Sequence, residues 1–335
     1  MKPLQKYLLK RVAAYIVTLY GAVTAVFFLF RLIPGNPIEA FIGQIMATQF
    51  TQAELARKLV EQYKAEFGLE GDLFTQYVNY MRQLLRGNFG VSLYGFPRSA
   101  QELIFQSLPW TIGLLGLSAV ISWFFGVVLG ALTAWKRESK VGAVLAGLAV
   151  VFSQIPYYII AVTLVLVFSY MLGWLPATGA YNPSLSPGLN IQFILSVIKY
   201  GLLPALSLVL TQAFGWFLST RYLTISLLGE DFLVYAEAKG IKQSRLFRRY
   251  VFRNILLPQT TGLGISLGFM IGGQIVLETI FAYPGMGYLF SRALGMLDYN
   301  LISGILILQS FVVLTANLIL DLVYPLIDPR VKYHE

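Results

Sequence analysis

The chain has 335 residues, of which 57% are hydrophobic and only 12% are charged. A soluble protein carries about 25% charged residues, so this composition indicates an integral membrane protein whose main solvent is lipid. The chain has no cysteine and one histidine, His334. This excludes a disulfide framework, thiol chemistry and a two-histidine metal site, and we expect neither catalytic residues nor metal ligands.

Six stretches are long and apolar enough to cross a bilayer, which takes roughly 20 residues for a helix. A helix satisfies its backbone hydrogen bonds within one segment, as lipid requires, so the expected fold is all-α. The first stretch is too long for the core of a signal peptide and lacks a small-residue cleavage site, so we expect a retained span. The six expected spans are 9–33, 108–135, 141–172, 201–227, 255–281 and 301–327.

The basic residues predict the orientation of these spans. If both termini are cytoplasmic, sixteen of the 25 Lys and Arg residues lie on the cytoplasmic side, as the positive-inside rule requires. The net charge of +9 is then explained by the membrane surface, and we expect no binding of nucleic acid.

This topology divides the chain into four segments. Residues 34–107 form an extracytoplasmic insertion, in which a four-residue apolar period predicts an amphipathic helix between Thr51 and Gly68. A second helix is expected over 73–85, ended by Gly87. The insertion is either a solvated cap or a docking surface for an external partner. The other segments are 1–33 (cytoplasmic N-terminus and first span), 108–327 (core with spans two to six, including two cytoplasmic helices within 228–254) and the cytoplasmic tail 328–335.

A dense basic stretch, AEAKGIKQSRLFRRYVFRN, separates spans four and five at 236–254. We expect one short helix capped by Asp231 and ended by Gly240, and a second helix capped by Ser244. A loop bound to anionic lipid would explain the charge. The small residues Ala236 and Ala238 would let a foreign backbone approach, which favours a docking site for a second protein. The second helix should carry Leu246, Phe247, Tyr250 and Val251 on one face and Arg245, Arg248, Arg249 and Arg253 on the other.

The stretch YAEAKGIKQSRLFRRYVFRNILLP resembles the coupling motif of binding-protein-dependent ABC importer permeases, in the version of the B-type subunit of dipeptide and oligopeptide permeases. Glu237 and Tyr250 depart from the usual residues of that motif. This difference affects the expected contacts of the motif, and it leaves the resemblance to the family unchanged. Further motifs follow in the family's order: RLIPGNP at 31–37, GNFGVSL at 87–93, LPATG at 175–179, LLPALSL at 202–208, ETIFAYPGMG at 278–287, DYN at 298–300 and NLILDLVYPLIDPRVKY at 317–333.

The resemblance implies a type I importer fold with six spans, in the plasma (inner) membrane of a prokaryote. It implies a second permease subunit, usually a different chain, two ATP-binding subunits and an extracytoplasmic substrate-binding protein. This chain is expected to bind no cofactor and to be no enzyme, since ATP and magnesium belong to the partner subunits. The absence of a GxxxxGK[ST] loop agrees with that division of labour. The residues expected to couple to the ATPase are Asp231, Tyr235, Ala236, Ala238, Lys239, Gly240, Arg245 and Arg249.

Polar residues within the spans are candidates for a gate or a translocation path, because such groups are costly in lipid. These are Glu278 and Gln274 near the outer end of span five, together with Gln154 and Gln212. Asp321 is a second acidic candidate, in span six. Each residue has an alternative role in hydrogen bonds that join helices.

The expected substrates are di- and oligopeptides, with oligosaccharides or nickel chelates as alternatives within the same architecture. An ion-driven secondary transporter is a distant alternative, because such proteins usually show internal repeats and more intramembrane charge.

Overall fold

A computed structural model describes residues 3–32, 71–136 and 139–327. The amphipathic helix expected between Thr51 and Gly68 and the tail 328–335 lie outside the described residues. The chain divides into two compact units. The first unit combines the chain up to Pro109 with the chain from Gly285 onward, and the second is Trp110–Pro284.

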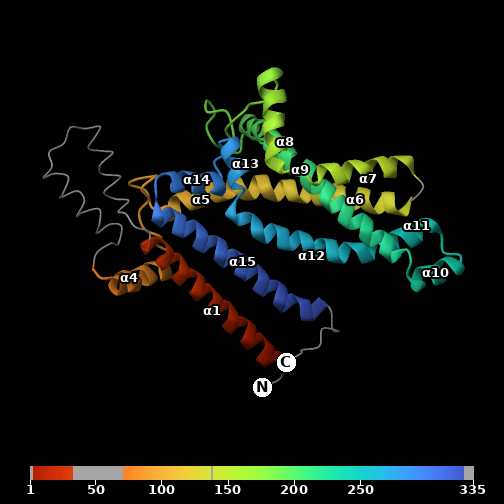
Figure 1. Cartoon of the computed structure of the whole chain (residues 1–335), viewed down its shortest axis with the longest axis horizontal. Coiled ribbons are helices and arrows are strands. Elements are labelled where there is room, and N and C mark those ends of the chain that lie inside the picture. The colour runs from red at the N-terminus through yellow and green to blue at the C-terminus, as the bar shows by residue number, and fades with distance from the viewer. Residues whose placement is uncertain (1–2, 33–70, 137–138, 328–335) are drawn as a thin grey trace. The chain divides into compact units, whose positions relative to one another are not determined.

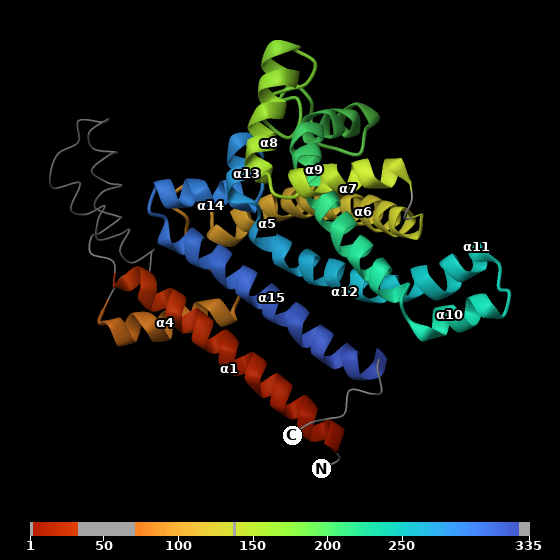
Figure 2. The same ribbon diagram turned by 45° about the vertical axis from the view of Figure 1, so that its right-hand side comes forward.

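The first unit is built on two long membrane helices, α1 and α15, which lie side by side (Figure 1, Figure 2). Tyr15 and Thr315 join them through a hydrogen bond of 3.0 Å between their hydroxyl oxygens. The helix expected at 73–85 is confirmed with those bounds, and Gly87 follows it in the left-handed conformation at φ +74°. The helices of this unit are α1 (Pro3–Arg31), α4 (Leu73–Leu85), α5 (Ala100–Thr111) up to Pro109, α14 (Met286–Gly295) and α15 (Tyr299–Ile327).

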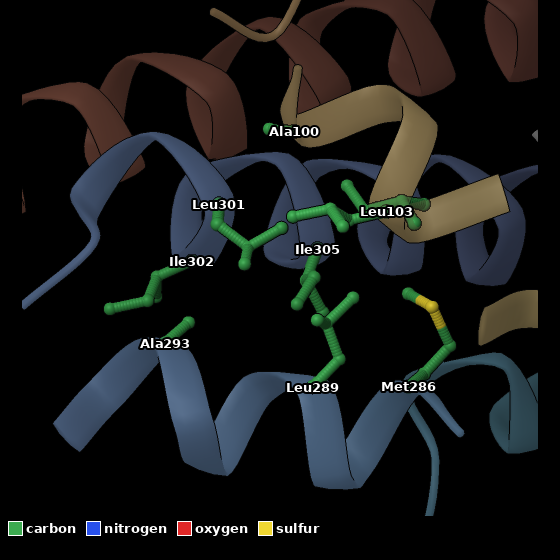
Figure 3. Close-up of a cluster of buried hydrophobic side chains, with 9 residues drawn as sticks. Ala100, Leu103, Met286, Leu289, Ala293, Leu301, Ile302 and Ile305 are labelled. Carbon is green, nitrogen blue, oxygen red and sulfur yellow. The ribbon is translucent and has the colours of Figure 1, made fainter. Parts of the chain in front are cut away.

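A buried apolar cluster holds α14 and α15 against the start of α5 (Figure 3). Side chains from the three helices point toward one another. The members are Ala100, Leu103, Ile104, Met286, Leu289, Ala293, Leu301, Ile302 and Ile305.

The GNFGVSL and DYN motifs meet in this unit. The buried carboxylate of Asp298 accepts hydrogen bonds from the Ser92 hydroxyl at 2.5 Å and the Tyr94 amide at 3.0 Å. Asn300 donates from its side-chain amide to the Val91 carbonyl at 3.0 Å. Burial raises the pKa of Asp298, and these hydrogen bonds oppose the rise because they favour the ionised form. The two motifs therefore fix the loop before α5 to the start of α15.

The second unit is organised around the close packing of α6 and α9. Gly126 and Gly130 permit this approach, since a Cβ at these positions would lie 2.6 Å from the Ala213 carbonyl and 2.5 Å from the Phe217 carbonyl. Small residues at helix contacts are typical of membrane bundles. The elements are η1 (Ile112–Gly116), α6 (Leu117–Trp135), α7 (Lys140–Phe152), α8 (Tyr157–Leu164), η2 (Val165–Met171), α9 (Ile191–Leu227), α10 (Asp231–Ala238), α11 (Gln243–Arg245), η3 (Leu246–Phe252), α12 (Arg253–Phe269), η4 (Met270–Gly272) and α13 (Ile275–Ile280).

The third expected span, 141–172, is not one helix. It breaks into α7 and the α8–η2 segment, which meet at an angle of 97°. Pro156 stands at the N-cap of α8 and explains the break. Proline has no amide hydrogen, and it disfavours helical backbone in the residue before it.

The fifth expected span, 255–281, differs at both ends. Its helix begins earlier, at Gln243, and ends at Gly272. Gly273 follows at φ +75°, a conformation that glycine adopts without strain, and the chain restarts as α13.

Among the described residues, five helices are long and apolar enough to cross a membrane, and the bent α7–α8–η2 pair makes a sixth if it counts as one span. The expected all-α fold is therefore confirmed for the described residues, and the helices agree with six spans when the bent pair is counted as one. The five continuous stretches are Tyr7–Arg31, Ala100–Trp135, Ile191–Leu227, Gln243–Gly272 and Tyr299–Ile319.

Candidate functional site

The basic stretch forms a short helical hairpin between two membrane helices of the second unit. α10 follows the end of α9 after a turn at Gly229, and α11 with η3 leads without interruption into α12. Both views show α10 and α11 projecting at the shared end of α9 and α12 (Figure 1, Figure 2). The expected pair of helices is present, and the second helix is an extension of span five.

Gly240 ends α10 in the conformation that the sequence predicts. Its φ is +74°, its amide donates to the Glu237 carbonyl at 2.8 Å, and the next amide, of Ile241, donates to the Ala236 carbonyl at 3.4 Å. This pair of bonds is a Schellman motif, which satisfies the last carbonyls of a helix. Ile241 and Ala236 also pack in the same apolar cluster, the contact that usually accompanies this motif.

The hairpin is fixed to the bundle by that apolar cluster, which we call the hairpin anchor. It joins the end of α6, the inner face of α10, η3 and the first turn of α12. Trp135 covers one side and contacts Phe247 with ring centroids 5.4 Å apart. The fully buried members of the hairpin anchor are Ala131, Leu233, Ala236, Leu246, Val251 and Ile255.

The opposite face of α10 is exposed and partly apolar. Val234 is 58% exposed and Tyr235 is 70% exposed, with Phe232 and Ala238 beside them. We call these four residues the α10 outer face. The residues that follow α10 include six exposed basic side chains: Lys239, Lys242, Arg245, Arg248, Arg249 and Arg253. The two-sided pattern expected for the second helix is thereby confirmed.

Three expectations about the hairpin are wrong in detail. Ala236 is buried in the hairpin anchor rather than open to a foreign backbone, whereas Ala238 is exposed. Asp231 is the first helical residue, Glu230 holds the N-cap position, and neither supplies a side-chain cap. Ser244 lies inside α11, whose N-cap position is Lys242. Asp231 still favours the helix, because a carboxylate in the first turn complements the helix dipole.

A surface cavity of about 240 Å³ opens beside α10. Glu237 and Gln243 contribute polar groups to its lining, and Glu237 Oε1 accepts a hydrogen bond of 2.7 Å from the Gln243 side chain. The cavity gives the exposed side of the hairpin a recess next to the α10 outer face. The lining residues are Trp135, Leu228, Leu233, Val234, Glu237, Gln243 and Leu246.

Glu278 and Gln274 come together at the break of span five. The backbone amide of Gln274 donates to Glu278 Oε1 at 3.3 Å, and the backbone amide of Glu278 donates to the backbone carbonyl of Gln274 at 2.9 Å. Glu278 is fully buried, and the same Oε1 accepts a bond of 3.0 Å from the Thr111 hydroxyl. Glu278 thus holds the restart of the helix against the last residue of α5, in agreement with the alternative structural role.

The other two path candidates belong to different elements from this pair. Gln154 is exposed at the bend between α7 and α8, where its side-chain amide lies 3.5 Å from the Ser153 hydroxyl. Gln212 is half-buried in the middle of α9. Asp321 belongs to α15, and its side chain lies outside the described part of the chain.

The sequence did not single out several residues on which these sites depend. Thr111 carries no motif, and only the fold brings it to Glu278. Trp135 closes span two, where a tryptophan reads as an ordinary interfacial anchor. Gln259 is buried in α12, donates to the Ser219 hydroxyl at 3.2 Å and accepts at its backbone carbonyl from the Trp123 indole at 3.0 Å.

Replacing Gly240 by alanine is expected to destabilise the hairpin by about 1–2 kcal/mol, because a Cβ is strained in the left-handed conformation. Gly229→Ala is the matched control, since its φ lies outside that region and its Cβ would lie 3.6 Å from the Ser226 carbonyl. We expect a lower melting temperature in detergent for G240A than for G229A. Equal melting temperatures would contradict the strain at Gly240.

Comparison with known proteins agrees with this architecture. The family model of the binding-protein-dependent transport system inner membrane component matches residues 126–333, and the N-terminal model of the same transport systems matches residues 4–97. The first match contains the whole hairpin and both flanking helices.

Curated relatives align over nearly the full length. The chain is 30% identical over 328 residues to the oligopeptide transport system permease protein AppB of Bacillus subtilis, which covers 98% of this chain and 99% of the relative. It is 32% identical, with the same coverage, to the probable peptide ABC transporter permease protein y4tP of Sinorhizobium fredii. It is 29% identical over 330 residues, again with 98% and 99% coverage, to the glutathione transport system permease protein GsiC of Salmonella typhi.

These relatives are permease subunits of ABC transporters, which are not themselves enzymes and which work with other subunits. The apolar helices agree with a multi-pass protein of the inner membrane. The chain therefore belongs to the binding-protein-dependent transport system inner membrane component family, as an ABC transporter permease subunit.

Proposed function

We propose that the chain forms part of the translocation path of a peptide importer. We propose further that it is coupled to cytoplasmic ATPases through the α10 outer face. The observation that carries this proposal is the position of α10. One side is buried in the hairpin anchor, while the other side is exposed, and the second helix of the hairpin carries exposed basic residues. A helix fixed on one side and exposed on the other is suited to dock a partner without losing its own support.

The connections of α10 favour the transmission of force. α9 enters the hairpin as a continuous helix of 37 residues, and Gln243–Gly272 leaves it as a helical stretch of 30 residues. The hairpin anchor joins α10 to α6 and α12 as well. A partner that displaces α10 would therefore move several membrane helices together, and ATP could bias the bundle between two states through that contact.

The assembly that we propose has a second permease subunit of different sequence, two ATP-binding subunits that hold ATP and magnesium, and an extracytoplasmic binding protein. Both termini of this chain lie in the cytoplasm in this arrangement, which places the basic hairpin on the side of the ATPases. The name of the Sinorhizobium relative, a probable peptide ABC transporter permease, supports ATP as the energy source over the ion-driven alternative.

Peptides are the favoured cargo, because the relatives are named for oligopeptide, peptide and glutathione transport. Oligosaccharides and nickel chelates remain alternatives for the same architecture. A binding protein that clamps peptide termini with charged groups would support peptides, and one with paired aromatic platforms would support sugars.

Co-purification tests the proposed assembly. The chain is tagged in its own organism and extracted in mild detergent, and the bound proteins are identified by mass spectrometry. We expect a second permease and one or two ATP-binding subunits, and a recovered binding protein would be screened against peptides, oligosaccharides and nickel chelates. Recovery of the chain without any ATP-binding subunit would contradict the docking role of the hairpin.

A further inference from the structure

Helix α4, of the first unit, has two chemically different sides. Asp72 caps it, with its carboxylate accepting from the Thr75 amide at 3.3 Å. Plotted at 100° per residue, the apolar and aromatic side chains fall on one side and the polar ones on the other. The apolar side carries Leu73, Phe74, Tyr77, Val78, Tyr80, Met81, Leu84 and Leu85, and the polar side carries Thr75, Gln76, Asn79, Arg82 and Gln83.

α4 is tied to a membrane span through Tyr77. The Tyr77 hydroxyl lies 2.8 Å from the Thr24 hydroxyl and donates to the Tyr20 hydroxyl at 3.0 Å. The Tyr77 ring also stacks on Phe28, with centroids 5.9 Å apart. Both views place α4 against the C-terminal half of α1 (Figure 1, Figure 2).

These contacts set the depth of α4 in the membrane. The apolar span in α1 ends at Arg31, and Thr24 precedes Arg31 by seven positions, or about 10 Å along the helix axis. The Tyr77 hydroxyl therefore reaches about 10 Å below the end of the apolar stretch, which is close to the depth of about 5–10 Å at which interfacial helices are buried. A helix of this kind, with one apolar and one polar side, lies flat in the boundary between headgroups and acyl chains.

Only part of the apolar side of α4 is used against α1. Phe74 is 74% exposed and Leu85 is 87% exposed, one near each end of the helix. In a helical projection these two residues lie on the flank between the α1 contact and the polar side. On α1, Phe28, which contacts Tyr77, is 40% exposed, and its neighbour Leu29 is 55% exposed.

We propose that α4 is an interfacial helix that inserts Phe74 and Leu85 among the acyl chains of the lipids around α1. Lipid is the occupant that fits, because α4 contacts a membrane-spanning helix that exposes apolar side chains, Phe28 and Leu29, at that contact. Arg82 and Arg86 are exposed at the polar edge, where long basic side chains reach phosphate groups. This assigns α4 to the bilayer, in place of the solvated cap or protein-docking surface that its sequence permits.

Spin labelling tests this assignment, and the absence of cysteine from the chain allows a unique label at each position. Phe74→Cys and Leu85→Cys place a nitroxide on the exposed flank, and Thr75→Cys and Asn79→Cys are matched controls on the polar side. The full-length chain is studied in its transporter complex, with cysteines of the other subunits replaced by serine, in phosphatidylethanolamine–phosphatidylglycerol liposomes. Collisions with oxygen, which enters the bilayer, are compared with collisions with a water-soluble nickel chelate.

We expect oxygen to dominate at positions 74 and 85 and the nickel chelate to dominate at positions 75 and 79. Dominance of the nickel chelate at 74 and 85 would show a helix in water and overturn the proposal. Low accessibility to both reagents at these positions would show a protein surface over the flank and would overturn it equally. The two ends of the flank are tested separately, so a variant that fails to fold leaves the other informative.

Discussion

Ala236→Leu is expected to abolish transport by disrupting the hairpin from within. Ala236 is 6% exposed in the hairpin anchor, and extra methylene groups in a packed core cost about 1–3 kcal/mol. Ala238 lies two residues away on the exposed side of the same helix. Ala238→Leu is expected to leave stability within about 0.5 kcal/mol and to stop transport by obstructing the ATPase contact.

The two variants are separated by measuring both stability and binding. We expect a lowered melting temperature for A236L alone, and loss of co-purified ATP-binding subunits for A238L at an unchanged melting temperature. Full binding and transport by A238L would remove the α10 outer face from the coupling contact. Equal stability of the two variants would contradict the burial of Ala236.

Glu278→Ala is expected to destabilise the second unit by about 2–5 kcal/mol. The change removes a buried acceptor of the Thr111 hydroxyl and the Gln274 amide, and it leaves a void where a fully buried side chain stood. Because Glu278 holds the restart of the helix after the break at Gly273, the loss should appear as a lower melting temperature of the purified protein.

Glu278→Gln is the matched control, because it keeps a side-chain oxygen in nearly the same volume. We expect a smaller loss of stability for E278Q than for E278A. If both variants melted like the wild type while transport fell, Glu278 would act on the cargo rather than on the packing of span five, and the structural role assigned to it would be wrong.

The sequence predicted the membrane class and the hairpin because their signals are local. Apolar runs mark spans wherever the solvent is lipid, and Gly240 marks the end of α10 because few other residues accept a φ of +74°. The alternation of apolar and basic residues after Arg245 predicted which side of η3 faces the bundle, and burial of Leu246 and Val251 confirms it.

The interruptions of spans three and five were harder to predict. A hydropathy profile does not distinguish a helix from a turn made of apolar residues. The bend at Pro156 and the break at Gly273 therefore lay inside apolar runs that predicted continuous helices. Both residues are recognised helix breakers, but membrane helices tolerate such residues when neighbouring groups satisfy the backbone. Pro204 and Pro258, which lie within α9 and α12, illustrate that tolerance.

The roles of single residues in the hairpin depend on tertiary packing. Ala236 and Ala238 are identical in type and close in sequence, yet one is buried and the other exposed. The difference arises because α10 rests on α6 and η3, which no local pattern reveals. For the same reason Thr111 could not be assigned to Glu278, which is 167 residues away in the chain.

Cross-linking tests most directly whether α10 couples the membrane helices to the ATP-binding subunit. Single cysteines at Tyr235 and Ala238, both exposed, would be compared with a cysteine at the buried Ala236 in the assembled transporter. We predict cross-links from positions 235 and 238 to an ATP-binding subunit, with yields that change when ATP is added, and none from position 236. An ATP-binding subunit that co-purifies with the chain yet cross-links to neither exposed position would contradict the coupling role of this helix.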